Sequence, residues 1–307
     1  MKAVFIDANG SLADVARRLH QPDDIALLVN EQPDITPEQV PGVMGDAEIL
    51  IVDHTSVPVE IAKQCKGLKH IVFLGTGARS YMNPEALAEI GIEVHIIKGY
   101  GDTAVAECAF ALMWASAKGF ARMDRGMRAG QWLRTDGIEL TGKTLGLIGF
   151  GGIAAEMARL ALGAGMNVIA YNRSPKTHAG VRFTDLDTVL ANSHVLSVHL
   201  LLNDDTRGFI SAERIAKMRD GVILINTARG AVIHEQALIA GLASKKIGHA
   251  GLDVFDIEPL PADHAFTKID NVTLSAHSAF RTPEASDNLI QASLNHCRRI
   301  SGQGQQR

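Results

Sequence analysis

Short apolar runs alternate with amphipathic stretches along most of the chain. Apolar runs bounded by turn-forming residues are typical of strands buried in a parallel sheet. Such runs occupy residues 4–6, 25–29, 49–52, 70–74, 94–97, 144–148, 168–171, 195–202, 222–225, 250–254 and 272–275. Helical spacing of apolar residues occupies 57–64, 84–90, 103–129, 155–162, 211–218, 234–242 and 283–300. This alternation predicts an α/β fold with parallel sheets.

The pattern divides into two parts. A chain of 307 residues suggests two domains of about 150 residues each. We expect a Rossmann-type doubly wound parallel sheet, residues 100–280, inserted into a second, smaller flavodoxin-like α/β domain, residues 1–99 and 281–307. A boundary near residues 99–101 follows from two glycines that flank a change of direction. The helix predicted at 103–129 is long enough to cross from one domain to the other.

A glycine turn follows the strand predicted at 144–148. Residues 149–154 read Gly-Phe-Gly-Gly-Ile-Ala, which has the form G-x-G-x-x-A. Gly149 permits the tight turn, Gly151 lets the backbone approach a pyrophosphate, and Ala154 allows close packing of the helix. Helix-start N–H groups, here at Gly152 and Ile153, form an anion site. Because a strand precedes the turn and a helix follows it, the stretch predicts dinucleotide binding.

Three polar residues follow later strands. Arg229, Glu258 and His277 come after the strands predicted at 222–225, 250–254 and 272–275, where an α/β sheet places its ligand site. An Arg fork can hold a carboxylate by two hydrogen bonds, and a His can exchange a proton near neutral pH. A Glu bound to the far ring nitrogen would fix the tautomer. The trio predicts acid–base chemistry on a carboxylate.

With these residues in place, the chain resembles the D-isomer-specific 2-hydroxyacid dehydrogenases from about residue 68 to residue 284. The motifs that carry the resemblance, beside the glycine turn, are residues 74–77, 104–107, 197–200, 225–230, 251–259 and 276–279. The resemblance implies hydride transfer between a nicotinamide cofactor and a small 2-hydroxy or 2-oxo acid. It also implies a homodimer paired through the cofactor domain.

The resemblance assigns roles to individual residues. Arg229 orients the substrate, His277 is the acid–base group, and Glu258 tunes His277. The resemblance implies that the substrate carboxylate is bound by backbone N–H groups of Leu74, Gly75, Thr76 and Gly77. It also implies that the cofactor contacts Thr103, Thr227, Ala228 and Asp253, the last at the nicotinamide carboxamide.

The residues after Tyr171 bear on the cofactor. An acidic residue about 20 positions beyond the glycine turn normally binds the ribose hydroxyls of NAD. This chain has Asn172, Arg173 and Ser174 there. Arg173 could pair with a 2′-phosphate, so we expect NADP(H) to be preferred, with NAD(H) possible. In the alternative, Asn172 binds both hydroxyls and Arg173 is solvated.

Asp53 and His54 bear on the substrate. Phosphoglycerate-type relatives often carry an Arg after the strand that is here 49–52, and a carboxylate would disfavour a phosphorylated acid. Because Arg79 or Arg281 could supply the missing positive charge, a 3-phosphoglycerate dehydrogenase is an alternative, as is a phosphite-oxidising enzyme. Glyoxylate, hydroxypyruvate and pyruvate are the expected substrates. An alternative outside the enzymes is a binding protein, because the same fold also occurs in nucleotide-sensing corepressors.

Composition narrows the partners. A net charge of −4 with no basic stripe argues against nucleic acid. Apolar runs are too short for a signal peptide or a membrane span, so we expect a cytoplasmic protein. The three cysteines have no metal-binding spacing, and we expect no metal site. Structural roles are expected for His20, His70, His95, His178, His194, His234, His249, His264 and His296.

Overall fold

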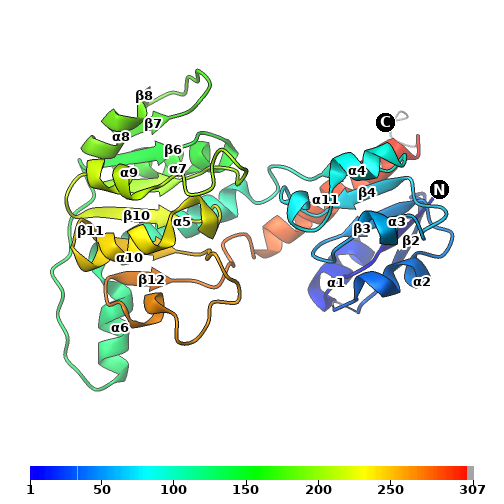
Figure 1. The fold of residues 1–307 in the computed structure, drawn as a ribbon, viewed down its shortest axis with the longest axis horizontal. Coiled ribbons are helices and arrows are strands. Elements are labelled where there is room, and N and C mark those ends of the chain that lie inside the picture. The colour runs from blue at the N-terminus through cyan, green and yellow to red at the C-terminus, as the bar shows by residue number, and fades with distance from the viewer. Residues whose placement is uncertain (33, 303–307) are drawn as a thin grey trace. The chain divides into compact units, whose positions relative to one another are not determined.

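A computed structural model describes residues 1–32 and 34–302 of the chain. The chain forms two compact units (Figure 1). One unit contains Met1–Gly101 and Thr282–Arg307, and the other contains Asp102–Arg281. None of the helices in the described ranges combines the length and the apolar character that a membrane span requires.

A five-stranded parallel sheet forms the centre of the first unit. Its order is β2-β1-β3-β4-β5, which is the flavodoxin-like order. The strands are β1 (Lys2–Phe5), β2 (Ala26–Val29), β3 (Ile49–Val52), β4 (His70–Phe73) and β5 (Glu93–Ile96). The helices are α1 (Gly10–Leu19), α2 (Val40–Met44), α3 (Val59–Ala62), α4 (Pro84–Glu89) and α11 (Pro283–Ile300). Helix α11 packs against α1, so the end of the chain completes this unit.

A seven-stranded parallel sheet forms the second unit. Its order β12-β11-β10-β9-β6-β7-β8 is the Rossmann order with one strand added (Figure 1). The strands are β6 (Thr144–Ile148), β7 (Asn167–Tyr171), β8 (Val181–Phe183), β9 (Val195–Val198), β10 (Val222–Asn226), β11 (Ile247–Leu252) and β12 (Val272–Leu274). The helices are α5 (Asp102–Lys118), α6 (Phe120–Arg128), α7 (Gly152–Gly163), α8 (Leu186–Asn192), α9 (Ala212–Lys217) and α10 (Glu235–Ala243). The predicted fold class is confirmed.

Alternate residues of the central strands enter two separate cores. In β6, Leu147 joins the cluster under α5 and α7, whereas Ile148 joins the cluster under α8, α9 and α10. Successive strand residues point to opposite faces of a sheet, and helices cover both faces here. This explains why these strands appear in the sequence as continuous apolar runs.

The prediction of a single helix at 103–129 is wrong. Two helices, α5 and α6, meet at Gly119, whose φ of 67° lies in the left-handed region. A Cβ at Gly119 would stand 2.7 Å from Oγ1 of Thr135, so both the conformation and the space require glycine. Helix α5 packs on α7, β10 and β11, and therefore belongs wholly to the second unit instead of crossing between units.

Two further differences concern short elements. Helices α1, α2 and α8 and strand β8 were not predicted. Helix α1 contains several polar residues, α2 and α8 are short, and β8 has Arg182 at its centre. The run at 195–202 forms a strand only as far as Val198, and the partly buried Leu200 and Leu202 pack on the core from beyond the strand end.

Protonated thiols are expected at all three cysteines. Cys65, Cys108 and Cys297 are free, and Cys65 and Cys297 are buried. Burial raises the pKa of Cys108 to about 11 and that of Cys297 to about 12. Burial also raises the pKa of Cys65. Thiols of this kind pack as small apolar groups and react slowly.

The buried His249 is expected to lower the free energy of unfolding in mild acid. Its ring is buried and bonds to Thr273 Oγ1 at 3.0 Å; burial, aided by the charges of Arg125 and Lys245, lowers its pKa from 6.5 to about 4. The unfolded chain therefore takes up this proton first. The contribution of the neutral His249 ring to the free energy of unfolding is complete above about pH 6.5 and is lost as the pH falls toward 4. We expect His249 to remove about 2 kcal/mol of unfolding free energy between pH 7 and pH 5.

Urea unfolding at the two pH values measures this loss. His249→Gln should flatten the pH dependence by about the same 2 kcal/mol. His234→Asn, in which the new residue can still cap α10, is the matched control and should keep the wild-type pH dependence. An unchanged pH dependence in His249→Gln would contradict the assignment.

Candidate functional site

Three neighbouring strands of the second unit bring the predicted trio to one edge of the sheet. Arg229 follows β10, Glu258 follows β11, and His277 follows β12. These strands are adjacent and parallel, so their carboxyl ends lie side by side. Polar side chains from three loops therefore gather where a doubly wound sheet binds ligands.

A hydrogen bond of 2.5 Å joins His277 to Glu258. Nδ1 of His277 faces Oε2 of Glu258, and Oε1 of the same carboxylate accepts the Phe255 N–H at 2.9 Å. The carboxylate therefore holds the Nδ1–H tautomer when the ring is neutral, and Nε2 carries the remaining site for proton exchange. The His277 and Glu258 side chains are 37% and 33% exposed, so a ligand can reach the pair.

Asp253 fixes the loop that carries His277. Oδ1 of this buried carboxylate accepts the Ser275 hydroxyl at 2.6 Å and the Ser278 N–H at 3.1 Å. Oδ2 accepts the Ala279 N–H at 3.0 Å, and the Asp253 carbonyl accepts the His277 N–H at 2.7 Å. These bonds hold His277 at φ 47°, a left-handed conformation that costs a non-glycine residue on the order of 1–3 kcal/mol. The structure thus gives Asp253 a positioning role.

Asn226 orders the loop that carries Arg229. Its amide nitrogen donates to the Arg229 carbonyl at 2.9 Å, and its amide oxygen accepts the Ala228 N–H at 3.0 Å. The half-buried Arg229 guanidinium donates to the Ala228 carbonyl at 2.6 Å. No acidic side chain in the described part of the chain pairs with Arg229, so its remaining donors are free for a ligand.

Gly230 joins the Arg229 loop to the Glu258 loop. A Cβ at this position would stand 2.0 Å from the carbonyl carbon of Phe255, closer than any real contact. The N–H of the same Phe255 holds Glu258, which in turn bonds His277. Backbone contact and hydrogen bonds thus link all three members of the trio, although no bond joins Arg229 directly to His277 among the described residues.

The glycine turn requires glycine at two places. Gly149 has φ 87°, and a Cβ there would stand 2.5 Å from the His199 carbonyl oxygen. A Cβ on Gly152 would stand 1.7 Å from Oδ2 of Asp102, whose pKa is raised by burial and by the charge of Glu156. Gly151 and Gly152 are exposed where α7 begins, and no side chain caps that helix. The bare helix start is suited to an anionic group.

Asn172 ties the end of β7 to this turn. Its amide oxygen accepts the Phe150 N–H at 3.0 Å, and its amide nitrogen donates to the Ser174 carbonyl at 2.8 Å. Arg173 is 82% exposed and lies 3.7 Å from the carboxylate of Asp205, which is 80% exposed. Such an exposed pair contributes about 0–1 kcal/mol, so another anion can displace it.

The loop that carries Arg229 also contains a buried polar atom without a partner. Oγ1 of Thr227 is buried and has no hydrogen-bond partner among the described residues. A buried hydroxyl without a partner costs about 1–3 kcal/mol, which a ligand group can recover. With the bare start of α7 and the close backbone at Gly149, this atom fits a dinucleotide along the carboxyl edge of the sheet. Of the other predicted cofactor residues, Thr103 and Ser174 are exposed, and Ile153 and Ala228 are half-buried.

The predicted carboxylate-binding loop lies in the first unit. Leu74 and Gly75 are buried at the end of β4, and Gly75 has φ 151°. Among the residues that the structure describes, the N–H groups of Thr76 and Gly77 have no acceptor. Two free, neighbouring N–H groups are suited to an anion such as a carboxylate.

Asp7 is a residue whose importance the sequence did not indicate. Its fully buried carboxylate accepts the N–H groups of Asp53, His54 and Thr55 at 2.8–2.9 Å, and also the Thr55 hydroxyl at 2.8 Å. Nδ1 of His54 lies 3.6 Å from Asp7 and 3.1 Å from Asp53. Asp7 after β1 and Asp53 after β3 thus place two carboxylates around the imidazole of His54. The sequence signal that could have indicated Asp7 is its position directly after the apolar run at residues 4–6.

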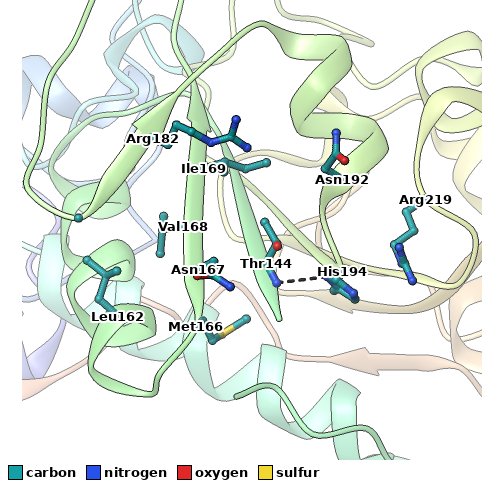
Figure 2. A pocket seen from close by; sticks show the side chains of 11 residues that line it. Thr144, Leu162, Met166, Asn167, Val168, Ile169, Arg182, Asn192, His194 and Arg219 are labelled. Carbon is teal, nitrogen blue, oxygen red and sulfur yellow. Dashed lines mark hydrogen bonds between the residues drawn. The ribbon is translucent and has the colours of Figure 1, made fainter. Parts of the chain in front are cut away.

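A hollow of about 600 Å³ lies at the opposite edge of the second unit's sheet (Figure 2). It is lined where β6, β7 and β9 begin, and Nδ1 of His194 accepts the Thr144 N–H there at 3.2 Å. Arg182 and Arg219 also line it. Parallel strands place their amino and carboxyl ends at opposite edges, so this hollow is separate from the trio.

Comparison with known proteins agrees with this geometry. The family model for "D-isomer specific 2-hydroxyacid dehydrogenase, NAD binding domain" matches residues 110–279. A hydroxypyruvate reductase of Thermotoga maritima is 40% identical over 84% of this chain and 88% of its own length. A D-3-phosphoglycerate dehydrogenase of Archaeoglobus fulgidus is 37% identical over 78% of this chain and 47% of its own length. The structure of an acyclic imino acid reductase in complex with NADPH and D-Arg superposes with TM-score 0.85 at 27% identity, covering 99% of this chain and 98% of that one.

Proposed function

This chain belongs to the D-isomer specific 2-hydroxyacid dehydrogenase family, and on that premise we propose that it reduces a small unphosphorylated 2-oxo acid with NADPH. Family membership makes it an oxidoreductase that uses a nicotinamide cofactor. Glyoxylate and hydroxypyruvate are the proposed substrates. The observation that carries the proposal is the linked arrangement of Arg229, Glu258 and His277 at the carboxyl edge of the second unit's sheet.

The proposed mechanism assigns each side chain one step. A bound nicotinamide supplies the hydride that the carbonyl carbon accepts. Arg229, half-buried and without an acidic partner in the described ranges, holds the substrate carboxylate with its planar fork. His277 gives a proton to the carbonyl oxygen from Nε2, while Glu258 keeps Nδ1 protonated. Asp253 and Asn226 position the two loops.

The loop after β3 supports an unphosphorylated substrate. Asp53 and Asp7 put two carboxylates around His54, and like charge disfavours a phosphate group there. The similar hydroxypyruvate reductase also supports this choice. Turnover of glyoxylate, hydroxypyruvate, pyruvate and 3-phosphohydroxypyruvate tests it. We expect the highest kcat/KM with glyoxylate or hydroxypyruvate, and activity on 3-phosphohydroxypyruvate alone would refute the proposal.

We propose that Arg173 selects NADPH over NADH. Its guanidinium is exposed and lies 3.7 Å from the Asp205 carboxylate. The amide oxygen and the amide nitrogen of Asn172 each already form one hydrogen bond within the protein. A charge-assisted hydrogen bond contributes about 1.5–3 kcal/mol, which corresponds to roughly tenfold or more in preference. Arg173→Ala should therefore lower the ratio of kcat/KM for NADPH to that for NADH at least about tenfold.

The control for this prediction is Arg128→Ala. Arg128 is an exposed arginine of α6, so its loss removes the same charge far from β7 along the chain. The control should keep the wild-type ratio. If the wild-type enzyme clearly prefers NADH, or if Arg173→Ala keeps the NADPH preference, the proposal fails.

Domain roles and assembly extend the proposal. The first unit is proposed to bind substrate through the free N–H groups of Thr76 and Gly77, and the second unit to bind the dinucleotide. Three free cysteines and no disulfide among the described residues support a reducing compartment such as the cytoplasm. We propose a homodimer, which sedimentation of the purified chain tests by mass.

A further inference from the structure

Three metal-ligating side chains project from neighbouring strands of the first unit. His70 begins β4, and Glu93 and His95 lie on β5, the last strand of the sheet. The register pairs His70 with Glu93 and Val72 with His95. Residues two apart on a strand share a face, and so do neighbours in register, so all three side chains lie on one face.

The ligand atoms of this group have the spacing of a metal centre. Nδ1 of His70 lies 3.3 Å from Nε2 of His95, and Oε2 of Glu93 lies 3.7 Å and 3.8 Å from these two atoms. In the plane of the three atoms, the point equidistant from them lies about 2.1 Å from each, which is close to the Zn–N and Zn–O bond lengths of about 2.0–2.2 Å.

The burial of the three side chains suits metal binding. The His70 and His95 side chains are 22% and 15% exposed, and Glu93 is 69% exposed, so two rings are held in place while the carboxylate leaves an entry path from solvent.

We propose that His70, Glu93 and His95 bind one Zn²⁺ ion, with water as the fourth ligand. Two imidazoles and one carboxylate are a ligand set that zinc takes in proteins. An ion at this place joins β4 to the sheet-edge strand β5, and binding to the folded chain alone would stabilise the fold. No metal-binding spacing is recognisable in the sequence, because the ligands come from two strands that only the register of the sheet aligns.

A further histidine, His296 on α11, lies beside this group. Its ring centroid lies 5.7 Å from that of His95. The three printed ligand-atom distances are satisfied without His296. His296→Ala is therefore the matched control, since it removes a histidine from the same cluster and leaves the ligand set intact.

Zinc titration of the full-length protein tests the proposal. After treatment with a chelator and removal of that chelator, calorimetry with Zn²⁺ alone should give one ion per chain, and zinc should raise Tm. His70→Ala and His95→Gln should each weaken binding at least about tenfold and abolish the rise in Tm. His296→Ala should bind as the wild type does. Circular dichroism without zinc verifies that each variant is folded.

Two results would overturn the assignment. One is the absence of stoichiometric binding to the wild type, which would leave a hydrogen bond between His70 and His95 as the whole function of the cluster. The other is a loss of zinc in His296→Ala as large as in His70→Ala. Neither readout depends on catalysis, so the outcome is independent of the proposed reaction.

Discussion

His277→Ala is expected to lower kcat/KM for reduction of glyoxylate or hydroxypyruvate by about 10²–10⁴, the usual range for losing acid–base catalysis. The variant has no group at Nε2 to protonate the developing alkoxide. Glu258 would keep its bond to the Phe255 N–H but lose its bond to the imidazole. Steady-state kinetics with saturating NADPH measures the effect.

The loss must be separated from a general effect on the fold. NADPH affinity should stay within a few-fold of wild type, since the glycine turn is built from residues 149–154 and does not contact His277 among the described hydrogen bonds. His234→Asn, which can preserve the cap of α10, should retain full activity. Near-normal turnover in His277→Ala would remove His277 from the mechanism.

Arg229→Ala is the second variant with a large expected effect, again a fall in kcat/KM of about 10²–10⁴. The substitution removes the guanidinium fork that is proposed to hold the substrate carboxylate. Arg229→Lys should also be strongly impaired, because an ammonium group cannot form the two parallel hydrogen bonds that a guanidinium forms. Both KM and kcat are expected to change if Arg229 binds the carboxylate and also polarises the carbonyl.

Arg122→Ala is the matched control for Arg229. It removes an exposed guanidinium that pairs with Asp270 at 3.7 Å, and it should change kcat/KM little. Wild-type kinetics in Arg229→Lys would contradict fork-type binding. A fall confined to Tm, with kcat/KM preserved at a temperature where the variant is folded, would give Arg229 a structural role only.

Elements with strong local signals were predictable from the sequence. The strand at 49–52 and the helix at 283–300 have the predicted bounds. The strand is fully buried and ends at Asp53, and the helix begins with Thr282 as its cap and Pro283 in its first turn. The break at Gly119 was missed because the helical pattern continues on both sides, and only the contact with Thr135 shows why glycine stands there.

Some features of the candidate site could also be predicted from the sequence, and others could not. The common location of Arg229, Glu258 and His277 could be predicted, because each follows a strand and parallel strands end at one edge. The supports of these residues could not. Asp253 bonds to residues more than 20 positions away, and Gly230 abuts Phe255 only because β10 and β11 pair in one register. Such contacts depend on tertiary packing, which no local pattern encodes.

The measurement that tests the central claim most directly is the transfer of label from NADPH deuterated at both C4 positions to hydroxypyruvate. Hydride transfer at this site predicts D-glycerate that carries one deuterium at C2, formed in equal amount to the NADPH oxidised, and formation at least about a hundredfold slower in His277→Ala. Product without deuterium at C2, L-glycerate, or an unchanged rate in His277→Ala would contradict the account.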